Sequence, residues 1–318
     1  MSGRDTKPEP NDQVFDAVKG NWVDTMAPTW AKGYLRLSRI DRPIGTWLLL
    51  IPCWWGLCLA ILESGEPRPS DLWVFIACAM GAFLMRGAGC TWNDITDRNL
   101  DGQVARTKSR PIPSGQVNVK QALIWMFAQI TLAACILFSF NTAAILLGIA
   151  AVLPVTIYPF AKRFTWWPQV FLGIAFNWGA LLGYAAHSGG LGWPAIFLYL
   201  GGIAWTLFYD TIYAHQDKDD DALIGIKSTA RLFGDHSLIW LRCFTAISGI
   251  LMMLAILIAL EDGQRMLCIF GVFAFVAHLI WQMRRLDVDD GEVLIRLFRS
   301  NRDAGLLPIA VFIVAMMT

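Results

Sequence analysis

Charged residues are scarce in this chain. Asp, Glu, Lys and Arg make up 16% of its 318 residues, whereas 56% are hydrophobic and the mean hydropathy is +0.48. A soluble domain carries roughly a quarter charged residues, so this composition argues against an ordinary soluble protein. The formal net charge of +1 gives no reason to expect a nucleic-acid partner, and we expect none.

Soft metal-ligand patterns are also missing. The seven cysteines lie in apolar segments without CxxC spacing, which argues against a disulfide framework or a zinc site and favours packing roles. The four histidines share no spacing either. Only His215 lies close to an acidic cluster, and we expect all four to be core or interfacial residues.

What the chain does have is a series of long apolar stretches. Most approach the roughly 20 residues that cross a hydrocarbon core of about 30 Å as a helix. We therefore expect an all-α fold, a polytopic integral membrane bundle of about nine transmembrane helices. The expected spans, of which the last is short, are 44–62, 71–92, 120–140, 142–160, 168–187, 193–214, 236–260, 265–284 and 304–318.

Lys and Arg residues are distributed unevenly between the two sides of these spans. Twenty-two lie on the side that holds the N-terminus, and only Arg68 and Arg265 lie on the other. Loops rich in Lys and Arg stay in the cytoplasm. We therefore expect the N-terminus and the loops after the second and sixth spans to face the cytoplasm, or the matrix of a mitochondrion.

The first residues differ in composition from the rest. Residues 1–33 are polar and mixed in charge, and they lack the early apolar stretch of a secretion signal. Trp30, Tyr34 and Leu37 alternate with basic residues, as in a helix at a membrane surface. We expect residues 1–33 to form an extension that is disordered or interfacial, and 34–318 to form the membrane domain.

Two acidic clusters follow long apolar stretches. The first contains Asn93, Asp94, Asp97 and Asp101, and the second contains Asp210, Asp217, Asp220 and Asp221. On a helix, positions 93, 97 and 101 share one face, as do positions 210, 217 and 221. Desolvated carboxylates are costly and like charges repel, so such groups need cations between them.

The donor atoms of these clusters point to a particular cation. They are carboxylate and amide oxygens, which favour Mg²⁺ over zinc or copper. Because Mg²⁺ takes one or two carboxylates together with substrate phosphates, we expect a diphosphate as the ligand. The plain alternative is a pair of solvated acidic loops, which explains one cluster better than it explains two at matching helix ends.

Basic residues accompany the clusters and suit phosphate oxygens. They are Arg98, Arg106 and Arg110 after the first cluster, and Lys162 and Arg163 after a later span. The alternative is that they only mark the cytoplasmic side. Arg86 is different, because it lies inside the second span, where an arginine usually faces the bundle interior and has a partner.

Two long motifs resemble the signatures of the UbiA-type membrane prenyltransferases. The first is Asn93-Asp94-x-x-Asp97-x-x-x-Asp101-Gly102, followed by Arg106-Thr107-x-Ser109-Arg110-Pro111. The second runs from Tyr209-Asp210-Thr211-x-Tyr213-Ala214-x-x-Asp217 through Asp219-Asp220-Asp221 to Lys227-Ser228-Thr229. Within the family, the branch that prenylates 4-hydroxybenzoate is similar to this chain at Arg39-Ile40-Asp41-Arg42-Pro43 and Tyr158-Pro159-Phe160-x-Lys162-Arg163.

The resemblance implies a bundle around a central cavity and a reaction. In that reaction a polyprenyl group moves, with Mg²⁺, from polyprenyl diphosphate to the ring of a small aromatic acid, 4-hydroxybenzoate, for ubiquinone synthesis. The membrane would be a bacterial inner membrane or a mitochondrial inner membrane. The catalytic residues would be Asp97, Asp101, Asp217 and Asp221, and the metal ligands would be these four with Asn93, Asp94, Asp210 and Asp220.

The resemblance also implies residues that contact the two substrates. In this sequence they would be Arg39, Arg42, Arg86, Arg98, Arg106, Arg110, Tyr158, Lys162, Arg163, Tyr213 and Lys227. Either Arg39 or Arg42 would hold the carboxylate of the acceptor.

Three alternatives bear on this interpretation. A CDP-alcohol phosphotransferase core, DGxxAR, fits Asp101-Gly102-x-x-Ala105-Arg106, but its later aspartates would fall on Val119 and Leu123 and the second cluster would have no role. A divalent-cation transporter would normally bind near the bilayer midplane, whereas these clusters lie at one face. Among prenyltransferases, naphthoates, homogentisate and haem stay open as acceptors.

Overall fold

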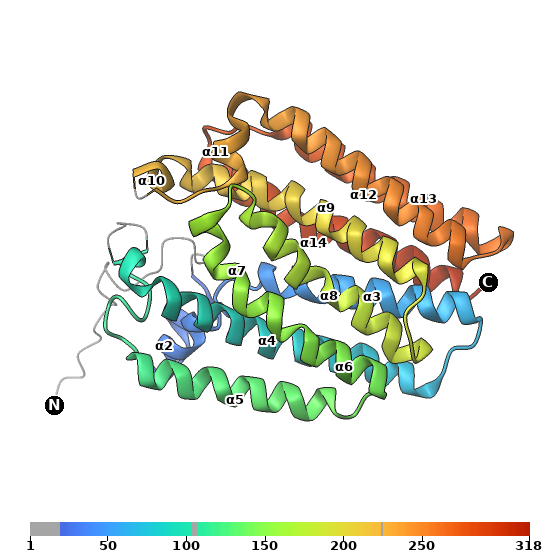
Figure 1. Cartoon of the computed structure of the whole chain (residues 1–318), viewed down its shortest axis with the longest axis horizontal. Coiled ribbons are helices and arrows are strands. Elements are labelled where there is room, and N and C mark those ends of the chain that lie inside the picture. Colours follow the sequence, from blue (N-terminus) through green and yellow to red (C-terminus); the bar gives the residue numbers. More distant parts are fainter. Residues whose placement is uncertain (1–19, 103–106, 224) are drawn as a thin grey trace. The chain divides into compact units, whose positions relative to one another are not determined.

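Helices are the only regular elements in the computed structural model, which describes residues 20–102, 107–223 and 225–318 (Figure 1). The expected all-α fold is therefore confirmed. The described chain divides into unit 1, residues 20–45 and 85–131, and unit 2, residues 46–84 and 132–318. Residues of both units are found in α3 (Ile44–Ser64), α4 (Pro69–Asp101) and α5 (Val119–Leu137).

Unit 1 begins with two short helices, α1 (Trp22–Thr25) and α2 (Thr29–Leu37). Gly33 lies so close to the chain before α5 that a Cβ added there would come 2.7 Å from the side chain of Val117. Close packing of this kind ties α2 to the rest of the unit. The small buried core of the unit consists of Leu37, Ile95, Val117 and Ala122.

Unit 2 contains the other helices. Those that lie wholly within it are α6 (Thr142–Ala150), α7 (Val152–Phe164), α8 (Pro168–Ser188), α9 (Trp193–Ala214), η2 (His215–Asp217), α10 (Lys218–Leu223), α11 (Thr229–Phe233), η3 (Gly234–His236), α12 (Ser237–Ala259), α13 (Asp262–Arg285) and α14 (Gly291–Ala315). The most extensive pairings among them are those of α9 with α12, α8 with α9, and α13 with α14.

Proline and glycine set the ends of α8. Pro168 occupies the first turn, where its missing N–H costs no helical hydrogen bond. Gly189 follows the last turn with φ of +77°, a left-handed conformation that glycine adopts without a Cβ clash. These two residues explain why the helix matches the expected span 168–187 closely.

Glycines also let α3 and α8 approach each other closely within unit 2. A Cβ on Gly56 would lie 2.0 Å from the carbonyl oxygen of Ala180, and one on Gly183 would lie 2.1 Å from that of Cys53. Such contact between backbones is typical of membrane helix pairs, which gain from packing rather than from leaving water. Larger side chains at these glycines would force the helices apart.

Polar side chains join the buried helices of unit 2. Trp205 donates its Nε1 hydrogen to Asn301 at 3.0 Å, and Asn301 and Gln282 form a pair of amide hydrogen bonds of 3.1 and 3.2 Å. Trp55 donates to the carbonyl of Gly305 at 2.8 Å. All of these donors are satisfied, as a buried polar group in an apolar interior requires.

Eight helical stretches of the described chain are long and apolar enough to cross a membrane. They are 44–64, 69–101, 119–137, 142–164, 168–188, 193–217, 229–259 and 263–285. They correspond to the first eight spans expected from the sequence. The ninth, 304–318, covers the second half of the 25-residue helix α14 and the three residues after it, and the first half of α14 contains Arg296, Arg299 and Arg302.

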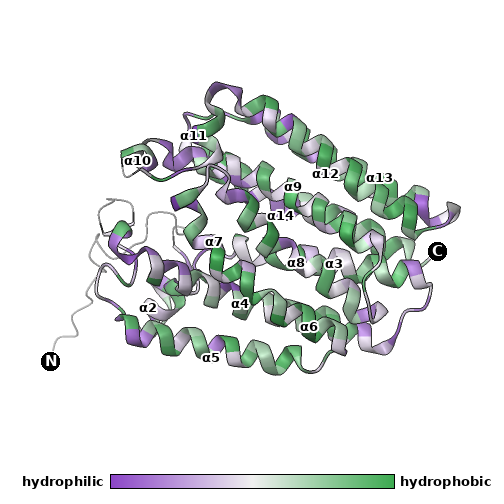
Figure 2. Ribbon diagram, viewed as in Figure 1, coloured by the Kyte–Doolittle hydropathy of each residue, from purple (hydrophilic) through white to green (hydrophobic). Residues whose placement is uncertain are grey.

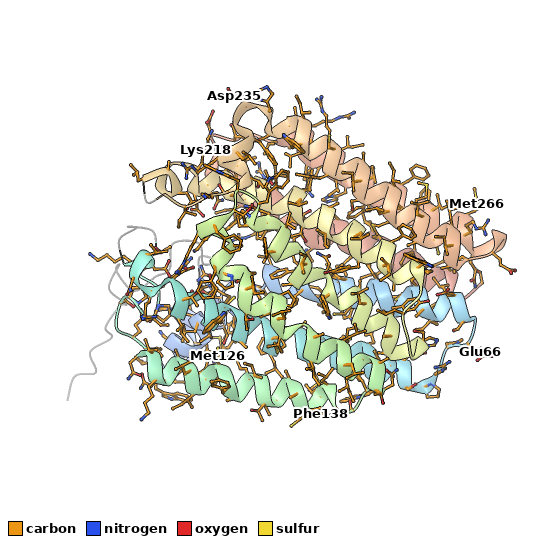
Figure 3. The ribbon with its side chains drawn as sticks, in the orientation of Figure 1. Glu66, Met126, Phe138, Lys218, Asp235 and Met266 are labelled. Carbon is orange, nitrogen blue, oxygen red and sulfur yellow. The ribbon has the colours of Figure 1, made fainter. Side chains whose placement is uncertain are left out.

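The outer faces of these helices are apolar. Figure 2 shows hydrophobic colouring along most of α5, α6, α12 and α13. Phe138 and Met266, labelled in Figure 3, are exposed, although they are large apolar residues. Exposed apolar side chains on long helices are expected where lipid replaces water, and the chain is an integral membrane protein.

Candidate active site

The first acidic cluster lies at the C-terminal end of α4, in unit 1. The helix continues through Asp101, as the spacing of the cluster requires. Asp94 and Asp97 are fully buried, Asp101 is nearly so, and Asn93 is half-buried. Carboxylates removed from water this completely need charged or hydrogen-bonding partners.

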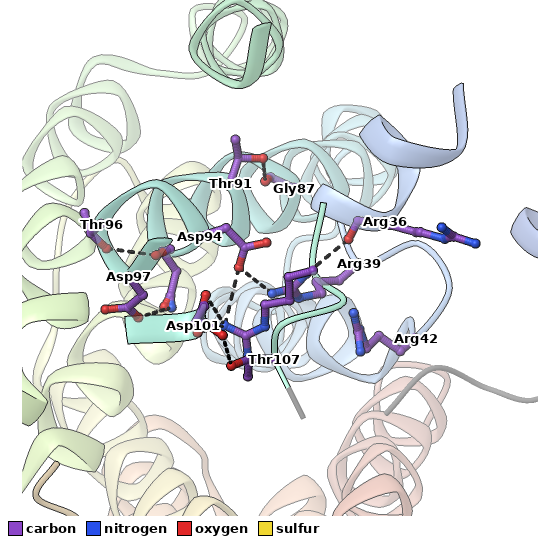
Figure 4. Close-up of polar contacts among 12 residues, drawn as sticks. Arg36, Arg39, Arg42, Gly87, Thr91, Asp94, Thr96, Asp97, Asp101 and Thr107 are labelled. Atoms are coloured by element: carbon purple, nitrogen blue, oxygen red, sulfur yellow. Dashed lines mark hydrogen bonds and ion pairs between the residues drawn. The ribbon is translucent and has the colours of Figure 1, made fainter. Parts of the chain in front are cut away.

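Two arginines from other parts of unit 1 meet this cluster (Figure 4). Arg39 donates to Asp94 over 2.5 Å. Arg110 contacts both oxygens of Asp101 at 2.8 Å and lies 3.7 Å from Asp94. The arginines therefore neutralise two carboxylates of the cluster, and hydrogen bonds to charged groups are the strong ones.

Arg39 has an unusual backbone conformation. Its φ of +56° makes it the non-glycine residue in the described chain with a left-handed conformation, which costs a side chain about 1–3 kcal/mol. Its guanidinium also donates to the carbonyl of Arg36 at 3.2 Å. Burial lowers the pKa of the Arg39 guanidinium, but the neighbouring acidic groups, chiefly Asp94, together more than offset this and raise the pKa. The local strain is thus held in place by the pair with Asp94.

Two buried oxygens of the cluster accept no hydrogen bond from any described residue. They are Oδ1 of Asn93 and Oδ2 of Asp94. The side-chain nitrogen of Asn93 donates to Asp97 at 3.3 Å, so the amide oxygen of Asn93 points away from Asp97. Within the described chain no three carboxylate, His or Cys groups converge as a ready metal site. The oxygens fit a cation such as Mg²⁺, which needs only one or two protein carboxylates.

The segment after Arg39 adds buried charges that the sequence analysis did not single out. Asp41 is 2% exposed, its oxygens accept no hydrogen bond from the described residues, and it lies 3.5 Å from Nε of Arg42. Burial raises the pKa of Asp41 to about 6. Its position within the motif Arg39-Ile40-Asp41-Arg42 was the only signal that sequence offered.

Arg86, on α4, lies against the start of α3. A Cβ on Gly45 would come within 2.5 Å of the guanidinium of Arg86. Only a glycine therefore leaves room for this arginine, which matches the expectation that an arginine within a span faces the interior. Arg98 differs, since its side chain is exposed and donates to the carbonyl of Ile95 at 2.8 Å.

The second acidic cluster lies in unit 2 and has a different construction. Asp210 is near the end of α9, Asp217 ends the 3₁₀ turn η2, and Asp221 lies in α10. All three are half-buried. The spacing suggests one helix face, but the 3₁₀ turn, which has about three residues per turn, interrupts it. His215 in this turn is buried and hydrogen-bonded to Ser237 at 3.1 Å, which supports a structural role.

The loop after the second cluster is fixed by hydrogen bonds to its backbone. Arg231 donates to the carbonyls of Asp221, at 3.3 Å, and of Ile226. The hydroxyls of Thr211 and Thr229 are 2.7 Å apart, which connects α9 to α11. Arg231 was not expected to matter, because nothing in its spacing distinguishes it from other basic residues of the loop.

Two expected phosphate-binding lysines come together here from separate segments. The backbone N–H of Lys227 donates to the carbonyl of Lys162 at 3.1 Å. The Lys227 ammonium reaches the carbonyl of Phe164 at 3.4 Å, and Arg163 lies over the ring of Phe160. Unit 2 therefore gathers positive charge from the end of α7 beside the loop of the second cluster.

Tyr213 packs beside a residue from the last helix. Its ring centroid is 4.5 Å from that of Phe298, which also lies 5.8 Å from the ring of Tyr209.

Tyr158 is half-buried on α7. Arg106 and the side chain of Asp220 lie outside the described residues. The first cluster belongs to unit 1 and the second to unit 2.

The chain is similar in sequence to a known protein family and to several of its named members. The sequence profile of the UbiA prenyltransferase family matches residues 49–302. The chain is 46% identical to the mitochondrial 4-hydroxybenzoate polyprenyltransferase of Rattus norvegicus, over 90% of this chain and 75% of that protein. It is 43% identical to the Homo sapiens protein of the same name, over 94% of this chain and 79% of that protein.

Solved structures show the same fold at lower identity. A UbiA homolog from Aeropyrum pernix K1 matches with a TM-score of 0.70 and 22% identity, over 85% of this chain and 98% of that one. A UbiA homolog from Archaeoglobus fulgidus bound to GPP and Mg²⁺ matches with a TM-score of 0.67 and 18% identity. The match covers 90% of this chain and 100% of that one. The family profile and the curated relatives together cover most of the sequence, and this chain belongs to the UbiA prenyltransferase family.

Proposed function

We propose that this chain is a 4-hydroxybenzoate polyprenyltransferase. It transfers a polyprenyl group from polyprenyl diphosphate to the ring of 4-hydroxybenzoate, giving 3-polyprenyl-4-hydroxybenzoate and diphosphate. The observation that carries this is the 46% identity to a relative with that activity in its name, over 90% of the chain. Relatives of 43% identity with the same name extend from Homo sapiens to Dictyostelium discoideum.

The chemistry follows from the substrates. The bond between C1 of the prenyl chain and the diphosphate oxygen breaks, and diphosphate leaves with the electron pair. The allylic cation bonds to the ring carbon ortho to the phenol oxygen, and loss of the ring proton restores aromaticity. A site that excludes water protects the cation from hydrolysis.

In this proposal the cation of the enzyme is Mg²⁺. Divalent metal use is a property of solved family members, one of which holds GPP and Mg²⁺. When bound, Mg²⁺ neutralises charge on the diphosphate oxygens and makes diphosphate a better leaving group. The direct ligands in unit 1 would be Asp97 and the oxygens of Asn93 and Asp94 that accept no hydrogen bond from described residues.

Unit 2 holds the second set of candidate metal ligands. Asp217 and Asp221 are half-buried and remain accessible to a hydrated cation. Lys162 and Lys227 lie on adjacent backbone segments and would balance the charge of the leaving diphosphate. Tyr213 and Phe298 would provide an apolar wall for the first part of the prenyl chain.

The acceptor would bind through its carboxylate. Arg39 and Arg42 were equal candidates from sequence, and each is buried and paired with an aspartate, Arg39 with Asp94 at 2.5 Å and Arg42 with Asp41 at 3.5 Å. Both therefore stay candidates for the acceptor carboxylate. The orientation of the chain, with the N-terminus and both clusters on the cytoplasmic or matrix side, is likewise part of the proposal and rests on the distribution of Lys and Arg.

Prenyl transfer in a defined bilayer tests the proposal. The protein in nanodiscs is incubated with labelled 4-hydroxybenzoate, Mg²⁺ and polyprenyl diphosphates of several lengths, with and without EDTA. We expect a labelled, hydrophobic product whose formation EDTA abolishes and Asp97→Asn slows by about 10²–10³-fold. Asp235→Asn is the matched control, because Asp235 is exposed in η3 (Figure 3).

Two results would contradict the proposal. The first is no product from 4-hydroxybenzoate but product from a naphthoate or homogentisate, which would change the acceptor. The second is Mg²⁺ flux into sealed vesicles without any prenyl transfer, which would identify a transporter instead.

A further inference from the structure

The N-terminal helix pair exposes three large apolar side chains. Trp22 is 49% exposed, Met26 81% and Trp30 78%, each four residues from the next. The adjacent residues Val23 and Ala27 are buried, at 0% and 8%. One side of the segment is therefore packed against the protein, and the apolar side chains on the other side are exposed. Concentrations of exposed apolar side chains mark interaction surfaces.

The backbone under these side chains is held rigidly. Asn21 caps α1 by accepting from the N–H of Asp24 at 3.1 Å. Asp24 pairs with Arg36 of α2 at 2.8 Å, and both side chains are nearly buried. Lys32 donates to the carbonyl of Asp24 at 2.8 Å, and Arg36 to Gln116 at 3.0 Å. A paired, buried charge of this kind keeps α1 against α2, so the exposed residues are presented by an ordered hairpin.

The position of α2 within unit 1 indicates what covers these residues. Tyr34 of α2 packs against Trp125 of α5, with ring centroids 5.5 Å apart. Residues 119–137 of α5 form one of the candidate membrane spans, and Ile124 and Phe127 on it are 62% and 58% exposed. The contact with Trp125 therefore places α2 beside the first turns of a membrane-crossing helix, near the depth at which the bilayer surface lies.

We propose that Trp22, Met26 and Trp30 insert into the bilayer surface, so that α1 and α2 form an interfacial anchor. Tryptophan prefers the boundary between headgroups and acyl chains, where its ring is apolar and its N–H can meet water. The occupant is lipid rather than a protein, because α2 packs on α5 of the same unit, a candidate membrane span with exposed apolar side chains. The anchor leads within nine residues of Trp30 to Arg39, the partner of Asp94.

Depth measurements on the full-length protein in nanodiscs test this. Single spin labels are placed at positions 22, 26 and 30, after replacement of the exposed Cys135 and Cys243. The matched controls are labels at Thr25 and Thr29, exposed polar residues of the same hairpin. We expect relaxation by oxygen to exceed relaxation by a water-soluble nickel chelate at the first three positions, and the reverse at the two controls. Equal access of the nickel chelate at all five positions would overturn the proposal.

A label-free measurement guards against disturbance by the spin labels. The variant with both Trp22→Phe and Trp30→Phe keeps an aromatic ring at each exposed position. The fluorescence lost relative to the unmodified protein is the emission of these two residues. We expect brominated lipids to quench this emission from Trp22 and Trp30, and iodide to affect it little. Quenching by iodide alone would place the residues in water and refute the anchor, and shielding that appears only after soluble cell extract is added would indicate a protein partner instead.

The anchor and the enzymatic assignment fail separately. Neither measurement depends on turnover, so an inactive protein with shielded tryptophans would support the anchor. An active protein with water-exposed tryptophans would contradict the anchor and leave the assignment of prenyl transfer standing.

Discussion

The two acidic clusters contain the same kinds of residue but are built differently. In unit 1, Asp94 and Asp97 are fully buried, Asp94 is held by Arg39 from 55 residues away, and Asp101 is held by Arg110 from nine residues away. In unit 2, Asp217 and Asp221 are half-buried, Asp217 is the last residue of a 3₁₀ turn, and the loop beside them is fixed mainly by hydrogen bonds to its backbone. The first cluster is a preformed charge network, whereas the second leaves its carboxylates closer to solvent.

This difference in construction indicates different tasks for the two clusters. A buried network fixes geometry, because each charge depends on its partner and cannot move without cost. A half-buried cluster admits water and a hydrated cation more readily. We therefore expect substitutions in unit 1 to affect stability as well as activity, and those in unit 2 to affect mainly activity and its dependence on Mg²⁺.

The largest effect should follow removal of Arg39. The change Arg39→Ala leaves Asp94 buried without its main partner, and breaking a buried ion pair from one side costs about 3–5 kcal/mol. We expect a marked fall in the Tm of the detergent-solubilised protein, measured with a thiol-reactive dye that detects exposure of the buried cysteines. Arg302→Ala is the control, because its pair with Asp303 is exposed and surface pairs contribute about 0–1 kcal/mol.

A double substitution sharpens this test. Arg39→Met together with Asp94→Asn removes both charges and keeps side chains of similar length. We expect it to recover much of the Tm lost in Arg39→Ala, since replacing both members of a buried pair is far less costly than removing one. If the double variant is no more stable than the single one, the role of Arg39 does not depend on Asp94.

The next effect concerns activity and compares the clusters directly. We expect Asp97→Asn and Asp217→Asn each to lower kcat/KM by about 10²–10³-fold, the usual cost of losing one electrostatic contact in a reacting site. Raising Mg²⁺ should restore part of the activity of Asp217→Asn only, because a half-buried site can replace a lost oxygen with water. Equal rescue of both variants, measured by initial rates over a Mg²⁺ series, would remove the distinction between the clusters.

Arg231 should give a smaller effect. It holds the carbonyls of Asp221 and Ile226 and so shapes the loop of the second cluster without belonging to it. We expect Arg231→Ala to raise the Mg²⁺ concentration for half-maximal rate several-fold, because the loop of the second cluster loses hydrogen bonds from a charged group, which contribute about 1.5–3 kcal/mol. We expect only a minor change in Tm. Arg242→Ala, on the neighbouring α12, is the matched control. A fall in Tm comparable to that of Arg39→Ala would instead show that Arg231 supports the fold.

The sequence predicted the parts of both clusters that depend on local order. Positions 93, 97 and 101 share a face because α4 is one helix through Asp101. The apolar stretches gave the spans because a helix in lipid must be long and nearly uncharged. The 3₁₀ turn that ends at Asp217 was not predicted, since a change from about 3.6 to about 3 residues per turn over one turn leaves no mark in the hydrophobic pattern.

Contacts between distant segments could not be predicted at all. Arg39 and Asp94 are 55 residues apart, and the sequence analysis placed them in separate roles, one for substrate and one for metal. Lys162 and Lys227 were both expected near phosphate, but only the fold brings their backbones together. Asp41 was overlooked because an aspartate between two arginines reads as a solvated charge, whereas its burial depends on packing of the whole of unit 1.

The smallest expected effect is a pH dependence that belongs to unit 1. Burial raises the pKa of Asp41 to about 6, above its ordinary value of 3.8. Between these values the unfolded chain loses its proton while the folded protein keeps it, so the folded state binds more protons and the free energy of unfolding falls as pH rises from about 4 to 6. Above pH 6 both states are ionised at Asp41, and this contribution becomes constant. Asp41→Asn should remove the slope and raise the Tm at pH 7, measured across pH 4–8, whereas Asp235→Asn in an exposed turn should change neither. A slope that persists in Asp41→Asn would assign the titration to another group and would weaken the view that unit 1 holds its charges away from water more strictly than unit 2 does.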